Sequence, residues 1–294
     1  MPATASSLRL SFKNILFPTD FSEISQQALR YALAIARAQG SKLYVTHAVQ
    51  PEPPLTIPLE PIPLDMDPAW QHARKSLEEF LEQEQVREVV REGVLEQGDL
   101  WRVLDDVIHR HSVDLIVLGS HGRHGLSKLV LGSSAEQIFR RASCPVLTIG
   151  PEAARTQTTS PDFRHIVFAT DFSAGSLHAL PYALSLAEEN QAELTLAHLI
   201  PLVPMQHQEE LRLSALKRLR ELVPVDAEDW CRIEYLVSFE FPAEGILSLA
   251  ASRHANLIVM GVHGKGARSS SHLPWAIAYE VVCHAPCPVL TVRG

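Results

Sequence analysis

The sequence is poor in cysteine, in net positive charge and in long apolar runs. Its 294 residues include only 4 cysteines, too few for a disulfide framework, which indicates a reducing compartment. A formal net charge of −8 argues against general binding to nucleic acid, which needs a basic face. No apolar run approaches the ~20 residues of a spanning helix, and residues 1–13 lack the apolar core of an export signal. We therefore expect a cytoplasmic protein that binds neither nucleic acid nor membrane.

Recognisable catalytic and metal-binding motifs are also missing. No serine or cysteine lies in a nucleophile elbow, and no Ser-His-Asp set can be assembled from motifs. The spacing of Cys283, His284 and Cys287, with His263 and His272 upstream, fits no usual zinc pair. We therefore predict no catalytic residues and no protein-held metal.

What the chain does contain is an internal repeat. Residues 14–22 match residues 165–173, and residues 144–148 match residues 287–291. A repeat of this length indicates two copies of one structural unit. At roughly 100–200 residues per domain, the chain length agrees with about two domains.

The repeat sets the domain boundaries that we predict. The first domain covers residues 1–150, a linker covers residues 151–162, and the second domain covers residues 163–294. Residues 50–67 interrupt the first domain, with six prolines at 51–63 and a seventh at Pro68, so they can form neither a helix nor a central strand. This stretch is either a lid over a ligand or a solvated, polyproline-like excursion.

Strand and helix patterns alternate along each copy. Apolar runs predict strands, and apolar residues at helical spacing predict helices between them. In the first copy we expect strands at 14–18, 42–49, 89–95, 114–118 and 145–149, and helices after residue 22 and around 70–88, 99–111 and 133–141. Such alternation implies an α/β fold of two tandem Rossmann-like domains, each with a mostly parallel five-stranded sheet and helices on both faces.

A glycine pattern follows the fourth strand of the first copy. Gly119 and Gly122 come directly after the strand, and Gly132 and Ser133 follow nine residues later, at the start of a helix. Glycine lets backbone N–H groups approach an anion, and a helix N-terminus favours negative charge. The cationic side chains of Arg123, His124 and Lys128 lie on the same loop. The pattern predicts a phosphate site, and the alternative is that the glycines serve tight turns.

Asp20 directly follows the first strand, so it would lie at the same sheet edge as the glycine loop. Its carboxylate could bind ribose hydroxyls or a Mg²⁺ ion shared with phosphates, or it could cap the following helix. The residue pattern leaves these roles open.

These motifs together resemble the universal stress protein family, in a tandem two-domain form, over nearly the whole chain. The resemblance rests on residues 15–22, His47, residues 114–122, the Gly132-Ser133 pair and residues 143–147. In that family, a G-x-x-G, nine residues, G-S/T pattern separates members that bind ATP from members that do not. The resemblance therefore implies ATP, with Mg, in the first domain.

Carried over by position, the resemblance also implies the residues that hold the nucleotide. Thr19 and Asp20 would lie beside it, and Ala48 would offer its backbone to the adenine. The glycines and serines of the loop would hold ribose and phosphates. The complete predicted set is Pro18, Thr19, Asp20, Ala48, Leu118, Gly119, Gly122, Arg123, Gly132, Ser133 and Ser134.

The second copy departs from the glycine pattern. Gly261 and Gly264 remain, but Trp275 and Ala276 stand where a glycine and a serine should recur. An indole would fill the phosphate space, so we expect no ATP there and hypothesise that Trp275 packs into the vacant site or an interface. Because Lys265 and other basic residues stay in this loop, a weak anion site is left open.

The sequence thus predicts an ATP-binding, nucleotide-dependent regulatory module that acts in a stress response through an unknown protein partner. The glycine loop lacks the G-K-S/T ending of a P-loop, so rapid ATP cleavage is not expected. Two alternatives stay open: a slow ATP-cleaving or self-phosphorylating enzyme, and a structural stress protein without a nucleotide. The apolar closing strands, 144–149 and 287–292, predict an intrachain pseudodimer, with homodimerisation undecided.

Overall fold

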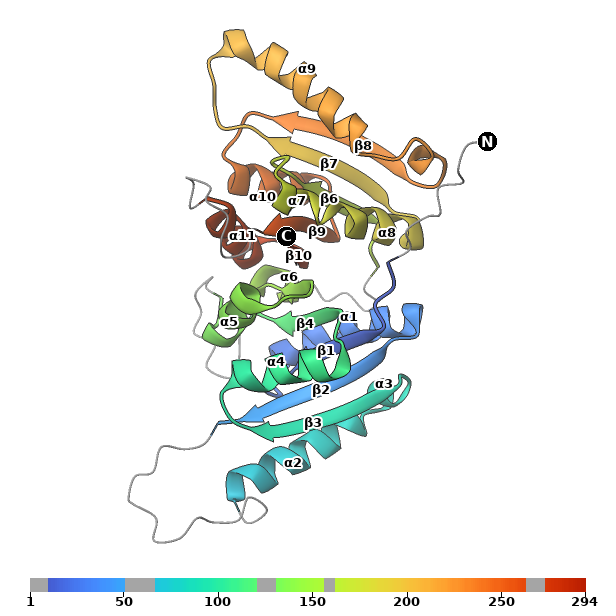
Figure 1. The fold of residues 1–294 in the computed structure, drawn as a ribbon, viewed down its shortest axis with the longest axis vertical. Coiled ribbons are helices and arrows are strands. Elements are labelled where there is room, and N and C mark those ends of the chain that lie inside the picture. The colour runs from blue at the N-terminus through green and yellow to red at the C-terminus, as the bar shows by residue number, and fades with distance from the viewer. Residues whose placement is uncertain (1–9, 51–66, 121–130, 156–161, 263–272) are drawn as a thin grey trace. The chain divides into compact units, whose positions relative to one another are not determined.

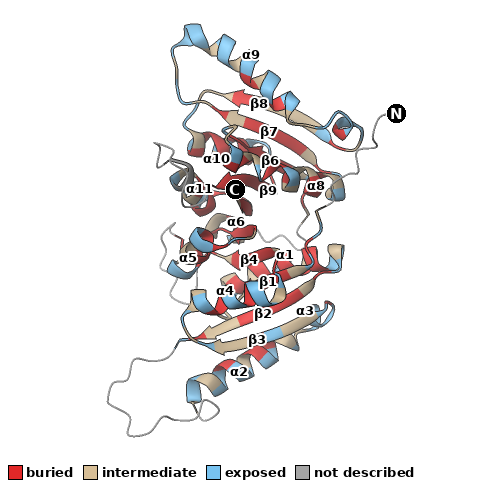
Figure 2. Ribbon diagram, viewed as in Figure 1, coloured by how far each residue is buried: buried red, intermediate tan, exposed pale blue. Residues whose placement is uncertain are grey.

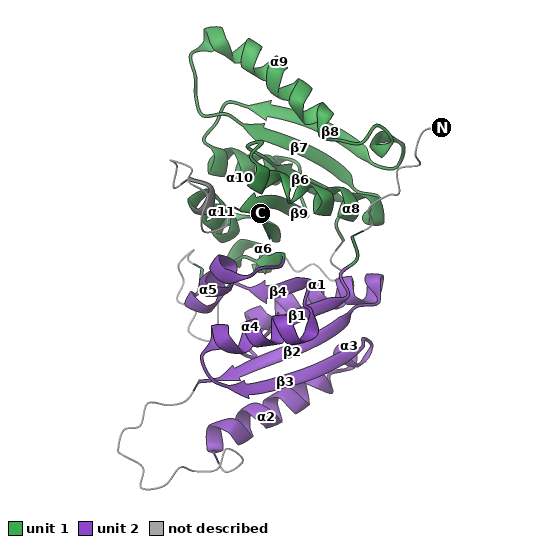
Figure 3. Ribbon diagram, viewed as in Figure 1, with its two compact units in different colours: residues 1–11, 129–131, 145–294 green, residues 12–128, 132–144 purple. Residues whose placement is uncertain are grey.

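The computed structural model describes residues 10–50, 67–120, 131–155, 162–262 and 273–294 (Figure 1). It divides into two compact units (Figure 3). The N-terminal unit comprises residues 12–128 and 132–144, and the C-terminal unit comprises residues 1–11, 129–131 and 145–294. The proline-rich residues 51–66 and residues 156–161 of the predicted linker lie outside the described part.

The N-terminal unit is built on a parallel sheet. Its strands are β1 (Asn14–Pro18), β2 (Lys42–Val49), β3 (Arg91–Gln97) and β4 (Leu115–Gly119). Their order is β3-β2-β1-β4, and each neighbouring pair is parallel. The carboxyl ends of β1, β2 and β4 therefore meet at one edge.

Helices join the strands of this unit and cover its sheet. They are α1 (Glu23–Gln39), α2 (Pro68–Leu81), α3 (Glu84–Arg87), α4 (Leu100–His111) and α5 (Ser133–Arg141). Right-handed crossovers put α1 and α2 on one face and α4 and α5 on the other. The helix predicted at 70–88 is in fact two helices, α2 and α3, and the strand predicted at 89–95 is shifted to Arg91–Gln97.

The C-terminal unit contains the remaining strands. They are β5 (Val146–Ile149), β6 (His165–Ala169), β7 (Glu193–Leu199), β8 (Arg232–Ser238), β9 (Leu257–Val262) and β10 (Val289–Arg293). Their order is β5-β10-β9-β6-β7-β8. β5 and β10, the closing strands of the two repeats, pair antiparallel, and the other pairs are parallel.

The helices of the C-terminal unit differ in two ways from expectation. They are α6 (Pro151–Arg155), α7 (Ala174–Leu177), α8 (Leu180–Asn190), α9 (Met205–Glu221), α10 (Pro242–Ser252) and α11 (Leu273–His284), with a 3₁₀ turn at Ala227–Asp229. α6 occupies the start of the stretch predicted as a linker. The counterpart of α1 is split into α7 and α8, because Pro181 has no N–H and cannot continue a helix.

Buried side chains concentrate on the strands and on the helix faces that cover them (Figure 2). The largest fully buried side chains include Phe17 on β1 and Phe168 on β6, which occupy matching positions in the two repeats. Among the described residues, no helix has the length and apolar character needed to cross a membrane. The predicted fold class, an α/β protein with mostly parallel sheets and helices on both faces, is confirmed.

Candidate functional site

The loop after β1 is held by a compact set of hydrogen bonds. The Thr19 N–H donates to the Thr46 carbonyl at 2.9 Å, and His47 Nδ1 donates to the Thr19 carbonyl at 2.7 Å. Asp20 Oδ1 accepts bonds from the Ser22 N–H at 3.0 Å and from the Ser25 hydroxyl at 2.7 Å. The aspartate therefore braces the start of α1, while Ser22 itself is the N-cap.

Sequence reasoning missed the role of Phe21 in this loop. Its backbone lies in the left-handed region, with φ at 62°, which is unusual for an aromatic residue. The ring lies 4.8 Å from the His47 ring and 5.8 Å from the Phe80 ring, measured between centroids. These contacts hold the strained turn, and the duplicated Thr-Asp-Phe-Ser sequence was the available signal.

Gly119, at the end of β4, lies against the first turn of α1. A Cβ atom added there would be 2.7 Å from Ile24 Cγ2 and 3.0 Å from the Ile24 carbonyl oxygen. The close approach of α1 alone therefore requires glycine at this position. Leu118, before it, is buried, and Ser120, after it, is fully buried.

Gly132 connects the end of β4 to the start of α5. Its N–H donates to the Ser120 carbonyl at 2.7 Å, and it occupies the N-cap position of α5. As a glycine, the N-cap residue has no side chain that could accept a hydrogen bond from this turn, and both Ser133 and Ser134 are exposed. The first turn of α5 thus offers backbone N–H groups and two hydroxyls at the β4 end of the sheet.

The other predicted site residues fall into two groups. Pro18 ends β1, and Ala48 is a half-buried residue near the end of β2, so both lie at the same sheet edge as Asp20. Gly122 and Arg123 lie outside the described residues. The structure therefore brings together nine of the eleven predicted residues at one edge and describes nothing of the remaining two.

The second repeat contains the same loop after β6. The Thr170 N–H donates to the Ala197 carbonyl at 3.0 Å, and His198 Nδ1 donates to the Thr170 carbonyl at 2.8 Å. Asp171 Oδ1 accepts from the Ser173 N–H at 2.9 Å. The loop geometry is therefore common to both repeats and does not depend on the glycine pattern.

The phenylalanine of this second loop packs against a charged residue. The Phe172 ring lies 4.4 Å from the His198 ring, and the Arg218 guanidinium lies 3.9 Å above the Phe172 ring. Burial first, and then the nearby Arg218 charge, lower the pKa of His198. An arginine from α9 thus stands where the first repeat uses Phe80.

The end of β9 repeats the packing of Gly119 but not the rest of the glycine pattern. A Cβ atom at Gly261 would collide with the backbone of Gly175 and Ser176. Trp275 lies in α11, with its side chain outside the described part, and Ala276 is exposed. Gly264 and Lys265 also lie outside the described residues.

The cysteines are free thiols. Burial raises the pKa of Cys287 to about 12, that of Cys144 to about 12 and that of Cys231 to about 11. Cys283 and Cys287 are buried, and His263 and His272 are not among the described residues. Within the described ranges, no cluster of three or more histidine, cysteine or acidic residues is placed to hold a metal.

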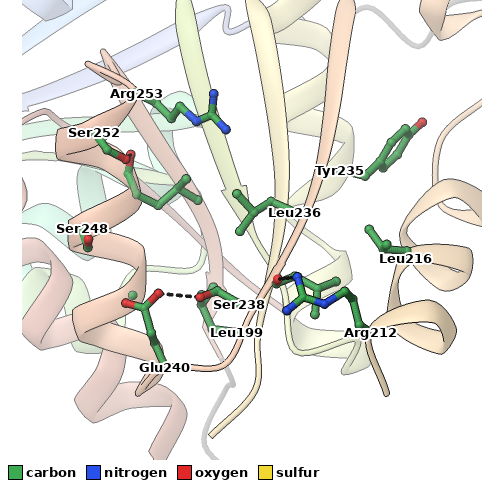
Figure 4. Close-up of a pocket in the computed structure, with 13 residues that line it drawn as sticks. Leu199, Arg212, Leu216, Tyr235, Leu236, Ser238, Glu240, Ser248, Ser252 and Arg253 are labelled. Carbon is green, nitrogen blue, oxygen red and sulfur yellow. Dashed lines mark hydrogen bonds between the residues drawn. The ribbon is translucent and has the colours of Figure 1, made fainter. Parts of the chain in front are cut away.

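A cavity of about 390 Å³ lies elsewhere, in the C-terminal unit around β8 (Figure 4). Arg212 and Leu216 of α9 line one side, and Ser248 and Ser252 of α10 line the other. No sequence motif pointed to this cavity, because its residues come together only through the α9 and α10 crossovers.

The comparisons with known proteins agree with this fold and with the repeat. The sequence model of the universal stress protein family matches residues 11–150 and again residues 162–293. A universal stress protein of Methanocaldococcus jannaschii is 30% identical over 142 residues, which is 47% of this chain and 82% of that protein. One from Mycobacterium bovis is 29% identical over 192 residues, covering 62% of this chain and 63% of that protein.

Solved structures extend the likeness to the full length. The crystal structure of a universal stress protein from Archaeoglobus fulgidus aligns with a TM-score of 0.70 at 20% identity, covering 96% of this chain and 97% of that one. The α/β architecture, the duplicated strand-end loop and the two family matches define a tandem α/β stress-protein class. The chain belongs to the universal stress protein family.

Proposed function

We propose that the first repeat binds one ATP and that the second repeat binds none. The observation that carries this proposal is the start of α5. Its N-cap residue is a glycine without a capping side chain, its first turn exposes Ser133 and Ser134, and the Gly132 N–H bonds the Ser120 carbonyl just after β4. Helix N-termini with open N–H groups and hydroxyls suit phosphate oxygens.

The remaining predicted residues fit the rest of a nucleotide. The half-buried backbone of Ala48 lies near the end of β2, where the adenine would sit, and Asp20 follows the neighbouring β1. A carboxylate oxygen of Asp20 already accepts bonds from Ser22 and Ser25. The first turn of α1 would therefore hold the Asp20 carboxylate in place to bind ribose hydroxyls or a Mg²⁺ ion.

Binding without a catalytic base would make the protein a regulatory module rather than an enzyme. Nucleotide occupancy would be read by a protein partner, because a ligand that orders one surface favours the partner that recognises it. Phosphate release measured on the same samples separates this module from a slow ATP-cleaving enzyme. Transfer of label from ATP to protein separates it from self-phosphorylation.

Paired aspartate variants test which repeat is used. Asp20→Asn should weaken Mg-ATP binding, and Asp171→Asn, the same change at the same loop position, should leave it unchanged. Calorimetric titration of each purified, nucleotide-stripped variant measures the effect, and circular dichroism checks that both are folded. Equal losses in the two variants would contradict a site confined to the first repeat.

A further inference from the structure

β8 forms one end of the strand order in the C-terminal unit, with β7 on one side only among the described strands. The Ser238 carbonyl accepts from the Ile200 N–H at 2.9 Å, so it points toward β7. Because peptide groups alternate along a strand, those of Ile233, Tyr235 and Val237 point away from β7. Their N–H and C=O groups line an edge that can pair with another strand.

One side chain of the flanking helix reaches this edge. Arg212 of α9 donates through Nη1 to the Val237 carbonyl at 3.3 Å. The bond confirms that Val237 faces outward, and it is long enough to give way to a backbone donor. Figure 4 shows Arg212 and Tyr235 on the α9 side of β8, and Ser248 and Arg253 on the α10 side. The cavity is therefore the groove that flanks the edge strand on both faces.

Exposed apolar side chains are concentrated in the segments of the chain that lead into and out of the same strand. Of the seven large apolar residues exposed in the described part, six lie between residues 202 and 241, before, on or after α9 and at the start of α10. They are Leu202, Met205, Leu211, Leu213, Val225 and Phe241. Such a concentration beside an open strand indicates a protein interface rather than a small-molecule site.

The sequence of β8 is self-complementary in the antiparallel direction. With Tyr235 opposite the Tyr235 of a second copy, Ile233 faces the second copy's Val237, and all three outward residues form hydrogen-bonded pairs. Cross-strand pairs of aromatic and β-branched residues are favourable. No donor or acceptor of the outward set is then left without a counterpart.

Charge complementarity supports the same register. The Arg232 side chain is 83% exposed, and its Nε lies 3.7 Å from a carboxylate oxygen of Glu193. In the register centred on Tyr235, it lies opposite the second copy's Ser238, whose hydroxyl bonds Glu240. Glu240 is exposed, so each copy would place a cation beside an anion of the other. This contact would occur twice in a two-fold dimer.

We propose that the β8 edge docks a second copy of this chain, with the two β8 strands antiparallel and centred on Tyr235. The two α9 helices then lie on the same face of the joined sheets. This interface is distinct from the β5–β10 pairing within the chain, and it does not depend on nucleotide binding.

Sedimentation velocity over a concentration series tests the dimer. The wild-type chain should shift from monomer to dimer, and Arg232→Glu or Glu240→Arg should weaken dimerisation at least tenfold through like charges. The double variant, Arg232→Glu with Glu240→Arg, should restore it, which separates the interface from any loss of folding. Arg74→Glu, the same charge change on an exposed residue of α2, should have no effect.

Cysteine cross-linking tests the register. Antiparallel hydrogen-bonded partners have Cα atoms about 5.5 Å apart, a distance that a disulfide spans. Tyr235→Cys should form a disulfide-linked dimer under mild oxidation, while Val237→Cys, one pair away from the axis, and the wild type should not. A monomer at all concentrations would overturn the proposal, as would a dimer indifferent to the charge variants or cross-linked through position 237.

Discussion

Gly119 and Gly261 show that a single glycine can be required for reasons other than a ligand. Gly119 is the last residue of β4 and Gly261 the last but one of β9, and both lie where the first helical turn approaches too closely for a Cβ atom. The second repeat keeps Gly261, although Trp275 and Ala276 stand at the positions that match Gly132 and Ser133. The part of the pattern that is specific for phosphate is therefore reduced to the start of α5 and the loop before it.

The difference between these two contacts predicts different costs. Gly119→Ala meets the Ile24 methyl group, which can move, and the Ile24 carbonyl oxygen at 3.0 Å, which has to shift slightly, so we expect a loss of about 2 kcal/mol in the free energy of unfolding. Gly261→Ala meets backbone atoms of Gly175 and Ser176, which cannot move without shifting α7, so we expect about 3 kcal/mol. Urea denaturation measures both, and a larger loss in Gly119→Ala would contradict this packing account.

His198 is the residue whose protonation should couple to folding. Its pKa is lowered from the ordinary value of 6.5, chiefly by burial and further by Arg218. The unfolded chain then binds more protons than the folded chain as the pH falls below that value, so His198 destabilises the fold on acidification. His198→Gln should reduce the loss of stability between pH 7 and pH 5, as measured by urea denaturation at each pH.

Arg218 provides an independent check at the same site. Its positive charge opposes protonation of His198, so Arg218→Gln should raise the pKa of His198, as followed by NMR of the imidazole. Lys217→Gln, on the exposed side of α9, is the matched control and should leave that pKa unchanged. If both variants move the pKa equally, the Arg218–Phe172–His198 arrangement is not its cause.

At the scale of elements, the start of α1 depends on a side-chain cap. The Ser22 hydroxyl accepts from the Ser25 N–H at 3.3 Å, and Glu23 adds a favourable charge in the first turn. Ser22→Ala should lower the free energy of unfolding by about 1 kcal/mol. Thermal and urea denaturation measure this change, and Ser22→Asp, which keeps a capping oxygen, should remain near wild type.

Most elements of the first repeat follow from sequence pattern alone. The helix at Ser133–Arg141 and the strand at Lys42–Val49 have the predicted bounds, because the apolar period and the terminal residues agree there. The break between α2 and α3 was not predicted, since Glu82 and Gln83 are acceptable helix residues and only packing ends the helix. Pro181 did signal the break between α7 and α8, but the likeness of this stretch to α1 concealed it.

The candidate site was predictable in its location but not in its contacts. Asp20 and Gly119 follow strands, so their shared edge follows from a parallel sheet. The left-handed turn at Phe21 and the bond from Gly132 to Ser120 depend on the path of the chain between elements, which residue patterns do not encode. For the same reason, the sequence could not show whether Asp20 caps α1 itself or, as observed, accepts a hydrogen bond from the Ser25 hydroxyl while Ser22 is the cap.

At the scale of the whole molecule, the closing strands of the two repeats, β5 and β10, pair with each other. Leu147 pairs with Leu290, and the Thr291 hydroxyl donates to the Val146 carbonyl at 3.3 Å. We propose that this pairing makes the chain an intrachain pseudodimer.

The central claim is a single nucleotide site in the first repeat, and calorimetric titration with Mg-ATP tests it most directly. The nucleotide-stripped parent should bind about one ATP per chain. The variant Gly132→Trp with Ser133→Ala, which copies the second repeat, should bind none while keeping its circular dichroism spectrum. Two sites in the parent, or no binding at all, would contradict the account.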